Sequence, residues 1–296
     1  MTEAGPIFIP IIIVSYNNDT DVRSCVAALS RLNSSVRYDL FVCENGGAIA
    51  FDRLIATLTG PDGPCDPDSA AESLPLPPRL RRVIRLRFKR ATSRPDAIIR
   101  IGEAKENFGY AGGVNCWLRP LLSLPEWRGV WILNPDTEAQ PAALTELIEY
   151  ANRHDRCMVG SRLCPPGRPD IVHSRGLTWR KWRAAPLAVD YFSPAATSVA
   201  PDVIDRKLDA ASGASTYVPR DWLVRIGLMD EGFFLYFEDM DWGLRAKKLG
   251  GVVGYADGSF VTHVGGTTIG SSPHRAERSP LSVYTLFKRE FGTSLG

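Results

Sequence analysis

Hydrophobic residues near the start of the chain occur first in a continuous run and then at helical spacing. Residues 7–14 form a largely β-branched run, as expected for a central strand that is covered on both faces. After a polar segment, apolar residues recur at intervals of three and four from Val22 to Leu29, which predicts a helix with one apolar face. A second apolar run covers residues 38–43. This order predicts a β-α-β unit, in which a right-handed crossover joins two parallel strands.

The alternation of strand and helix patterns continues, but it is less regular after residue 164. We predict further strands at 98–101, 130–133, 157–160, 215–218 and 260–263, and helices that begin near Pro141, Arg220 and Glu238. In the first half, the predicted strands are followed by polar residues or glycines. The ligand crevice of an open α/β sheet forms at these carboxyl ends of the strands, so candidate functional residues are expected there.

Residues 60–97 depart from this pattern and predict an insertion. Its first part is rich in proline, and its second part carries eight basic residues, namely Arg79, Arg81, Arg82, Arg85, Arg87, Lys89, Arg90 and Arg94. The apolar residues between them are compatible with an edge strand or a short amphipathic element. A solvated charged surface is the favoured interpretation of the basic residues. Contact with an anionic molecule or with membrane head groups is the alternative.

Composition narrows the class of protein. The 296-residue chain has a formal net charge of +2, too close to neutral to indicate a nucleic-acid-binding protein. Its six cysteines are scattered without a Cys-x-x-Cys pair, which disfavours zinc and a disulfide framework and favours a reducing cytoplasm. No apolar run is long enough to span a bilayer. We therefore expect a cytoplasmic protein that is soluble, or at most peripheral to the inner face of a membrane.

Two residues at predicted strand ends are candidate ligands for a divalent cation. Asp136 follows the strand 130–133 in a turn fixed by Pro135, and His263 ends the strand 260–263. A carboxylate suits Mg or Mn, hard cations that prefer oxygen ligands, and the histidine offers a second ligand. A turn or helix-capping aspartate and a structural histidine are the alternative interpretations.

Carboxylates and glycines elsewhere indicate further chemistry. Glu238 and Asp239 lie at a predicted helix start, directly after the apolar run 233–237. A helix N-terminus stabilises carboxylates electrostatically, and an ionised aspartate beside a bound cation can also accept a proton. The glycine-rich segment 107–115 lets the backbone approach a ligand closely. Its spacing matches neither a dinucleotide-binding fingerprint nor a P-loop.

Together these motifs resemble the family 2 glycosyltransferases of GT-A fold, particularly their bacterial rhamnosyltransferase-like branch. The resemblance is carried by VSYNN (14–18), CENGG (43–47), NFGYAGGVN (107–115), LNPDT (133–137), ASGAS (211–215), GLMDEGFFLYFEDMDWGLRAKKLG (227–250) and VTHVGG (261–266). The matched order and spacing span residues 7–266. Each motif alone is weakly specific, but seven motifs in this order are strongly specific.

The resemblance implies an α/β architecture of GT-A type. A Rossmann-like, mostly parallel sheet would be flanked by helices, with a smaller mixed region on the acceptor side. Residues 1–160 would bind the nucleotide sugar, and the insertion 60–97 lies outside the family pattern. Residues 161–270 would form the acceptor and catalytic half of the same domain, and residues 271–296 would form a C-terminal helical segment.

The resemblance also implies roles for individual residues. Asp239, with Glu238 beside it, would act as the general base. Asp136 would be the last carboxylate of the family's Asp-x-Asp metal motif, whose first position is Asn134 in this chain. His263 would be a metal ligand or a diphosphate contact. The residues implied in donor binding are Ser15, Tyr16, Asn17, Glu44, Asn107, Gly113, Asn115 and Asn134.

The implied activity is transfer of a sugar from a dTDP- or UDP-sugar to a hydroxyl acceptor, with inversion at the anomeric carbon and with Mg or Mn as cofactor. Rhamnose is the leading sugar, and a glycan, a lipid-linked glycan or a small molecule is the acceptor, as in polysaccharide biosynthesis. The segment Glu44–Gly47 replaces the family's usual Asp-Asn-x-Ser, which leaves the preferred base open. A nucleotidyltransferase and a non-catalytic sugar-nucleotide-binding domain are the alternatives. Peripheral membrane contact and the oligomeric state also stay open.

Overall fold

A computed structural model describes most of the chain, namely residues 8–72, 74–89, 96–124, 126–180, 185–195, 200–265 and residue 286. The helices are α1 (Asp19–Leu29), α2 (Gly47–Thr59), α3 (Gly109–Leu122), α4 (Ala143–His154), α5 (Pro201–Asp205), α6 (Arg220–Ile226) and α7 (Glu238–Lys248). The strands are β1 (Phe8–Ser15), β2 (Arg37–Glu44), β3 (Cys65–Pro67), β4 (Leu80–Phe88), β5 (Ile98–Ala104), β6 (Gly129–Leu133), β7 (Thr137–Ala139), β8 (Met158–Cys164), β9 (Ile171–Val172), β10 (Leu177–Arg180), β11 (Ala185–Ala188), β12 (Ser193–Pro194), β13 (Ser215–Pro219) and β14 (Val253–His263).

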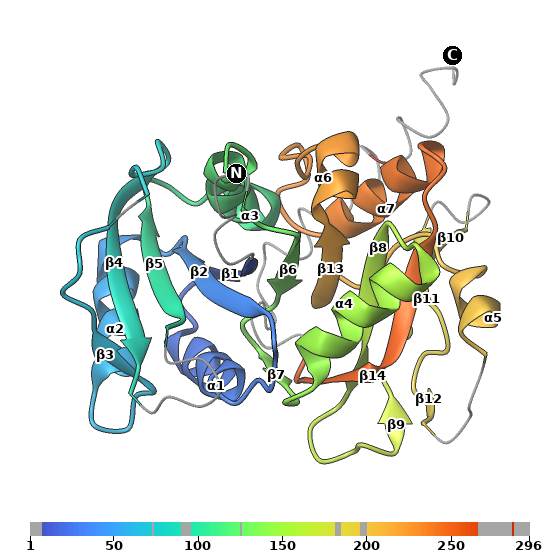
Figure 1. Cartoon of the computed structure of the whole chain (residues 1–296), viewed down its shortest axis with the longest axis horizontal. Helices are drawn as coiled ribbons and strands as arrows, with labels where there is room; N and C mark the ends of the chain where they lie inside the picture. The colour runs from blue at the N-terminus through green and yellow to red at the C-terminus, as the bar shows by residue number, and fades with distance from the viewer. Residues whose placement is uncertain are drawn as a thin grey trace, which may run out of the picture.

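One ten-stranded sheet runs through both halves of the molecule, in the order β3-β4-β5-β2-β1-β6-β13-β8-β14-β7 (Figure 1). The predicted β-α-β opening is confirmed, because β1 pairs in parallel with β2 and also with β6. Strands β4, β13 and β7 run antiparallel to their neighbours. The reversed strand β13 lies between β6 and β8 and so joins the two halves of the sheet. The predicted α/β class with a mostly parallel sheet is therefore confirmed.

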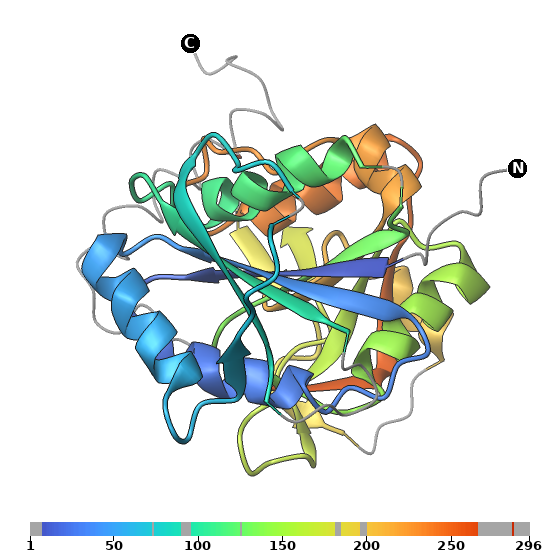
Figure 2. The same ribbon diagram turned by 60° about the vertical axis from the view of Figure 1, so that its left-hand side comes forward.

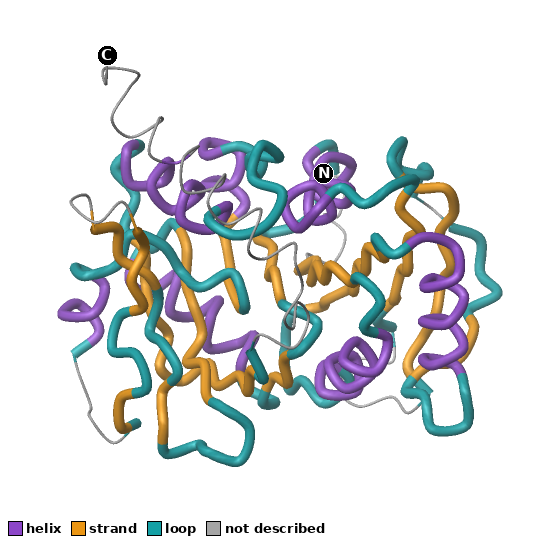
Figure 3. The backbone as a smooth tube through the Cα atoms, turned by 180° about the vertical axis from the view of Figure 1, so that it is seen from behind, coloured by secondary structure: helices purple, strands orange, loops and turns teal. Residues whose placement is uncertain are grey.

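Helices cover both faces of this sheet, and strand β1 shows how its residues are divided between them. Ile9, Ile11 and Ile13 pack with α1, α2 and α4, whereas Ile12 and Val14 pack with α3, α6 and α7. Successive side chains of a strand point to opposite faces, so one continuous apolar run supplies two cores. Figure 2 shows α3, α6 and α7 along one side of the strands and α1 and α2 on the other, and Figure 3 shows the same layers from behind.

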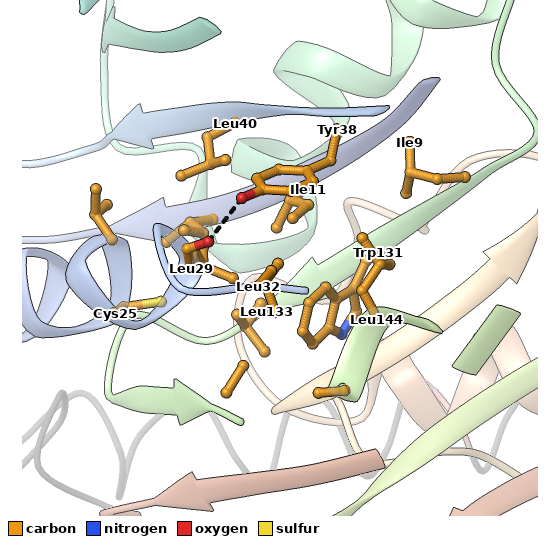
Figure 4. Packing of buried hydrophobic residues seen from close by; sticks show 14 of the residues in the cluster. Ile9, Ile11, Cys25, Leu29, Leu32, Tyr38, Leu40, Trp131, Leu133 and Leu144 are labelled. Carbon is orange, nitrogen blue, oxygen red and sulfur yellow. Dashed lines mark hydrogen bonds between the residues drawn. The ribbon is translucent and has the colours of Figure 1, made fainter. Parts of the chain in front are cut away.

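The core beneath α1 also satisfies its few polar groups. The Tyr38 hydroxyl donates a hydrogen bond of 2.9 Å to the carbonyl oxygen of Leu29 (Figure 4). Trp131 Nε1 donates a hydrogen bond of 2.9 Å to Ser215 Oγ on the neighbouring strand β13. Buried polar groups with partners avoid the desolvation penalty of unpaired groups. These strands therefore form a rigid support for the loops at their ends.

The insertion contributes strands to the sheet instead of lying outside it. Strand β4 is nine residues long and pairs with β5, and the short strand β3 pairs along its outer side. Three of the four arginines of β4 have carboxylate partners: Arg81 and Arg82 contact Glu103, the latter at 2.6 Å, and Arg85 contacts Asp68 at 2.8 Å. This pairing favours the interpretation of the basic residues as a solvated, internally balanced surface.

The second half adds smaller elements around the sheet. Strands β10 and β11 form one antiparallel pair, and β9 and β12 form another. The predicted C-terminal segment 271–296 lies outside the described residues except for Leu286, which is buried against Phe233 and Met240. Among the helices in the described ranges, none has the length and hydropathy needed to cross a bilayer.

Candidate active site

A cavity of about 340 Å³ opens where the two halves of the sheet meet. Its walls come from the loops that follow β1 and β6, the start of α3, the segment before β13, the start of α7 and the end of β14. The lining residues are Val14, Tyr16, Asn45, Asn107, Gly109, Tyr110, Asn134, Pro135, Ser212, Gly213, Ala214, Phe234, Leu235, Tyr236, Glu238, Asp239 and His263. The cavity therefore lies at the carboxyl ends of the parallel strands β1 and β6, where the sequence predicted a ligand crevice.

Asp136 lies against His263, which lines the cavity, although Asp136 itself is not part of the lining. His263 Nε2 lies 3.4 Å from Asp136 Oδ1, and both side chains are largely buried. The contact is built by the sheet, because β14 pairs with β7 and places His263 opposite Thr137. The backbone N–H of Val264 also donates to the carbonyl oxygen of Asp136 at 3.1 Å. Two residues that are far apart in the sequence are thus held together by backbone pairing.

Glu238 and Asp239 reach the cavity from the first turn of α7. The two residues before them, Tyr236 and Phe237, have positive φ angles of 68° and 71°. Residues other than glycine rarely adopt this conformation, and such strain concentrates at functional sites. Asp239 Oδ2 accepts a hydrogen bond of 2.9 Å from the backbone N–H of Gly213, and Oδ1 accepts one of 2.8 Å from the N–H of Met240. The Asp239 carboxylate is therefore held in one orientation.

Burial sets the protonation of these two carboxyl groups. Burial, and next the charge of Asp239, raises the pKa of Glu238 to about 8. Burial also raises the pKa of Asp239, but the hydrogen bonds from Gly213 and Met240 oppose the rise. Two adjacent buried carboxyl groups do not ionise together readily, because each charge disfavours the other. The hydrogen bonds to Asp239 therefore favour its ionised form, whereas burial and the neighbouring Asp239 favour the protonated form of Glu238.

The glycine-rich segment shapes the cavity through backbone contacts. Gly109 has a φ of 70°, and a side chain there would lie 2.2 Å from the carbonyl oxygen of Phe234. The backbone N–H of Tyr110 donates to that carbonyl at 2.8 Å. The Tyr110 hydroxyl donates to the carbonyl oxygen of Gly213 at 2.9 Å. The start of α3 is thus linked to both the turn before Glu238 and the loop that holds Asp239.

The residues predicted for donor binding divide into two groups. Tyr16, Asn107 and Asn134 line the cavity, and Tyr16 is 46% exposed. Ser15, Asn17 and Glu44 form a network behind it, which fixes the loop after β1. Ser15 Oγ donates to Glu44, whose Oε1 also accepts from the backbone N–H of Asn17 at 3.2 Å and of Gly46 at 2.7 Å.

Gly113 and Asn115 lie on α3, away from the cavity wall. A side chain at Gly113 would lie 2.7 Å from the Val14 side chain, so glycine lets α3 pack closely on β1. Asn115 is fully buried, and its Nδ2 donates to the carbonyl oxygen of Met229 at 2.8 Å and to Glu231 at 2.9 Å. Both residues therefore position the elements that carry the cavity.

Sequence patterns gave no role to several residues of the cavity. Tyr110, Asn45 and the segment 212–214 line it, although they lie within the motifs CENGG, NFGYAGGVN and ASGAS. Asn45 Nδ2 donates to the carbonyl oxygen of Gly109 at 2.9 Å and so ties β2 to α3. Membership of these motifs was the only signal in the sequence that could have marked these residues as part of the cavity. Their hydrogen bonds run to backbone groups far away in the sequence, and residue type alone does not reveal such partners.

The fit of a cation can be judged from the donor atoms. Within the described ranges, no group of three or more His, Cys, Asp and Glu side chains is arranged to hold a metal ion. Asp136 and His263 supply one oxygen and one nitrogen donor, and His263 Nδ1 is buried without a hydrogen-bond partner among the described residues. Two protein donors suit a Mg or Mn ion that takes most of its ligands from phosphates and water.

Known proteins resemble this chain in sequence. The chain is 24% identical over 142 residues to Agl10, a low-salt glycan biosynthesis hexosyltransferase of Haloferax volcanii; the match covers 48% of this chain and 44% of that protein. It is also 24% identical over 218 residues to an N-acetylglucosaminyl-diphospho-decaprenol L-rhamnosyltransferase of Mycobacterium tuberculosis, covering 66% of this chain and 68% of that enzyme. No protein-family model matches the chain.

Solved structures resemble it in fold. GalNAc-T7, solved with UDP, GalNAc and Mn²⁺, matches with a TM-score of 0.57 at 11% identity, over 88% of this chain and 44% of that one. Residues 1–349 of S. aureus TarS match with a TM-score of 0.54 at 10% identity, over 98% of this chain and 74% of that one. The chain has a GT-A glycosyltransferase fold. Both the predicted fold class and the predicted resemblance to glycosyltransferases are confirmed. In this GT-A fold, the cavity lies at the carboxyl ends of the central strands.

Proposed function

We propose that this chain is an inverting glycosyltransferase that moves a sugar from a nucleotide-diphosphate donor to a hydroxyl acceptor. The observation that carries the proposal is that His263, in contact with Asp136, and the carboxylates of Glu238 and Asp239 line one cavity. Sugar transfer needs a group that accepts the acceptor's proton and a group that stabilises the departing diphosphate. In this proposal Asp239 meets the first need, and His263 with the adjoining Asp136 meets the second.

Asp239 is the proposed general base. The acceptor oxygen attacks the anomeric carbon while the bond from that carbon to the diphosphate oxygen breaks, and the hydroxyl proton passes to Asp239. The hydrogen bonds from Gly213 and Met240 hold the carboxylate ready for this transfer. Because attack comes from the face opposite the leaving group, the anomeric configuration inverts. Glu238, which keeps its proton near neutral pH, limits the negative charge beside the base.

Asp136 and His263 are the proposed contacts of the diphosphate end. When bound there, Mg or Mn would neutralise the negative charge that develops on the departing nucleoside diphosphate. The structure with Mn²⁺ and UDP of GalNAc-T7 gives this assignment a precedent in the fold. His263 lies at a strand end beside the cavity, so its imidazole can also donate a hydrogen bond to a phosphate oxygen.

The proposed donor is a dTDP- or UDP-sugar, with rhamnose as the leading sugar. Tyr16, Asn107 and Asn134 are placed on the cavity wall to contact it. The proposed acceptor is a glycan, with a lipid-linked glycan as the leading form. Support for both choices comes from the mycobacterial relative, whose name specifies a rhamnosyl donor and an N-acetylglucosaminyl-diphospho-decaprenol acceptor. Peripheral contact with a membrane would follow from such an acceptor.

The test is a screen of dTDP- and UDP-sugars with Mn²⁺ and a panel of glycoside acceptors. A transferase releases nucleoside diphosphate, and its product has the opposite anomeric configuration to the donor, as read by NMR coupling constants. Release of pyrophosphate from a nucleoside triphosphate would indicate a nucleotidyltransferase instead. Donor binding without turnover on any acceptor would indicate a non-catalytic binding domain. A product that keeps the donor configuration would reject the single-displacement mechanism.

A further inference from the structure

A group of aromatic side chains lies next to His263, outside the cavity lining described above. The group, called here the aromatic platform, consists of His173, Tyr191 and Phe192. The ring centroid of His173 lies 5.8 Å from that of His263, 5.6 Å from Tyr191 and 5.0 Å from Phe192. Tyr191 and Phe192 also contact each other, with centroids 4.7 Å apart. The platform therefore adjoins the cavity at His263.

Its two outer rings are exposed to an unusual degree. Tyr191 is 64% exposed and Phe192 is 50% exposed. Neighbouring exposed aromatic rings are disfavoured in water unless they serve a contact. His173 contacts both rings and is part-buried. The two exposed rings are therefore held next to the cavity-lining His263.

The backbone is built to present these rings. Asp190 and Phe192 have positive φ angles of 51° and 49°, a conformation that residues other than glycine rarely adopt. The Asp190 carboxylate is held by the buried Arg175 at 3.3 Å. The N–H of Phe192 donates to the carbonyl oxygen of His173 at 3.2 Å. A strained turn that is tied down on both sides is typical of a functional site, because the strain would otherwise relax.

We propose that the aromatic platform binds a pyranose ring of the acceptor by stacking against its apolar C–H face. Ring faces of aromatic side chains carry partial negative charge and attract the C–H groups of a sugar. The position suits a saccharide acceptor that extends out of the cavity, because the platform adjoins the cavity-lining His263 but lies outside the lining itself. It is less suited to the nucleotide base, since Tyr16 on the opposite half of the sheet offers a ring for that group. This inference rests on the proposed transferase function.

The test uses methyl β-glycosides of glucose, galactose and N-acetylglucosamine as probes, with saturation-transfer NMR as the readout. Wild-type protein should bind at least one of them through its ring protons. Tyr191→Ala and Phe192→Ala should each weaken that binding about tenfold, while Tyr191→Phe should retain it. Ile49→Ala, which removes an exposed apolar side chain on α2, is the matched control and should leave binding unchanged. Thermal melting of every variant checks that the fold is retained.

Titration with UDP and dTDP in the presence of Mn²⁺ separates the two levels of the proposal. The alanine variants should bind nucleotide like the wild type, and in a turnover assay they should raise the acceptor KM with little change in kcat. Nucleotide binding that falls with the platform residues would overturn the acceptor assignment, as would a wild type that binds none of the glycosides. A wild type that binds no nucleotide would instead reject the proposed function itself.

Discussion

Two buried glutamates near the cavity differ in whether their carboxylate oxygens have hydrogen-bond partners. Glu44, at the end of β2, is 1% exposed and accepts hydrogen bonds from Ser15, Asn17 and Gly46. Glu238, at the start of α7, is 6% exposed, and its Oε2 has no partner among the described residues. The first carboxylate holds a loop in shape. The second leaves a buried oxygen without a partner, which lowers the free energy of unfolding. Buried polar groups of this kind are common at functional sites.

The backbones around Glu44 and Glu238 are also held in place by different kinds of contact. Around Glu44, one carboxylate at the end of β2 accepts hydrogen bonds from both the loop after β1 and the start of α2, so a single side chain satisfies their polar groups. Around Glu238, the strained residues Tyr236 and Phe237 are held by contacts from elsewhere, such as the bond between Tyr110 N–H and the Phe234 carbonyl. The loop after β1 is held by one buried side chain, whereas the turn before Glu238 is held by backbone contacts from the start of α3. Variants of each region should therefore behave differently.

The largest difference should appear in turnover after Asp239→Asn. This substitution keeps the shape of the side chain but removes the proposed base, so kcat should fall by about 10²–10⁴-fold while donor binding is retained. Asp241→Asn on the same helix is the matched control, because Asp241 pairs with Arg245 and does not line the cavity. Initial rates and donor titration measure the two effects. Equal loss of turnover in both variants would point to a structural role for Asp239.

The next effect concerns pH and Glu238. Its pKa is raised to about 8, above the value of the unfolded chain, so the folded protein binds its proton more tightly. The free energy of unfolding should therefore fall as pH rises from about 4.5 to 8, by roughly 2–4 kcal/mol from this group. Glu238→Gln should remove that part of the pH dependence and should make the protein relatively more stable at pH 8. Urea unfolding at pH 5 and pH 8 measures it, and parallel curves for both proteins would contradict it.

Glu44→Gln should act in the opposite direction. An amide keeps one oxygen for the N–H groups of Asn17 and Gly46, but it places a donor opposite the Ser15 hydroxyl, which now donates to the carboxylate. The free energy of unfolding should fall by about 1–3 kcal/mol at neutral pH. Thermal melting and urea unfolding measure this loss. A variant as stable as the wild type would show that the network behind the cavity does not stabilise the loop.

The smallest effect on the free energy of unfolding should come from an ion pair between β4's leading loop and the segment before α7. Arg79 Nη1 lies 2.6 Å from Glu231 Oε2, and both side chains are partly exposed. Arg79→Met should lower the free energy of unfolding by about 0.5–1 kcal/mol at low salt, and less at high salt because ions screen the pair. Arg81→Met, on the more exposed neighbour, is the matched control. A loss that does not change with salt would indicate packing of Arg79 on Phe108 as its source.

Sequence patterns predicted the first half of the fold well because its elements have regular periods. The run at 7–14 and the helical spacing from Val22 to Leu29 appear as β1 and α1 with small changes at their ends. Patterns were weaker between residues 164 and 209, where short strands pair in twos and residues such as Tyr191 are exposed. Short antiparallel pairs bury little surface, so they leave little periodicity in the sequence.

The candidate site was predicted to the extent that its residues follow strands. Asp136 lies directly before β7 and His263 ends β14, so the pairing of these two strands brings the residues together. The positions of Asn115 and Glu44 behind the cavity were not predictable, because an amide or carboxylate in a motif has the same residue type whether it faces a ligand or a backbone N–H. The positive φ angles of Tyr236 and Phe237 likewise depend on tertiary contacts, which local sequence preferences do not contain.

The reversed direction of β13 has a consequence for motion. Its neighbours β6 and β8 contribute their ends to this edge of the sheet, whereas β13 contributes its beginning, and the N–H of Gly213 that holds Asp239 lies just before it. The carbonyl oxygen of Ala214 accepts from the N–H of Asn134, which fastens this segment to the middle of the sheet. The amide of Gly213 should therefore exchange its hydrogen with solvent almost as slowly as the central strands do, and much more slowly than loop amides. If Asp239 is the base, as proposed, this anchor would keep its carboxylate in one orientation from one turnover to the next.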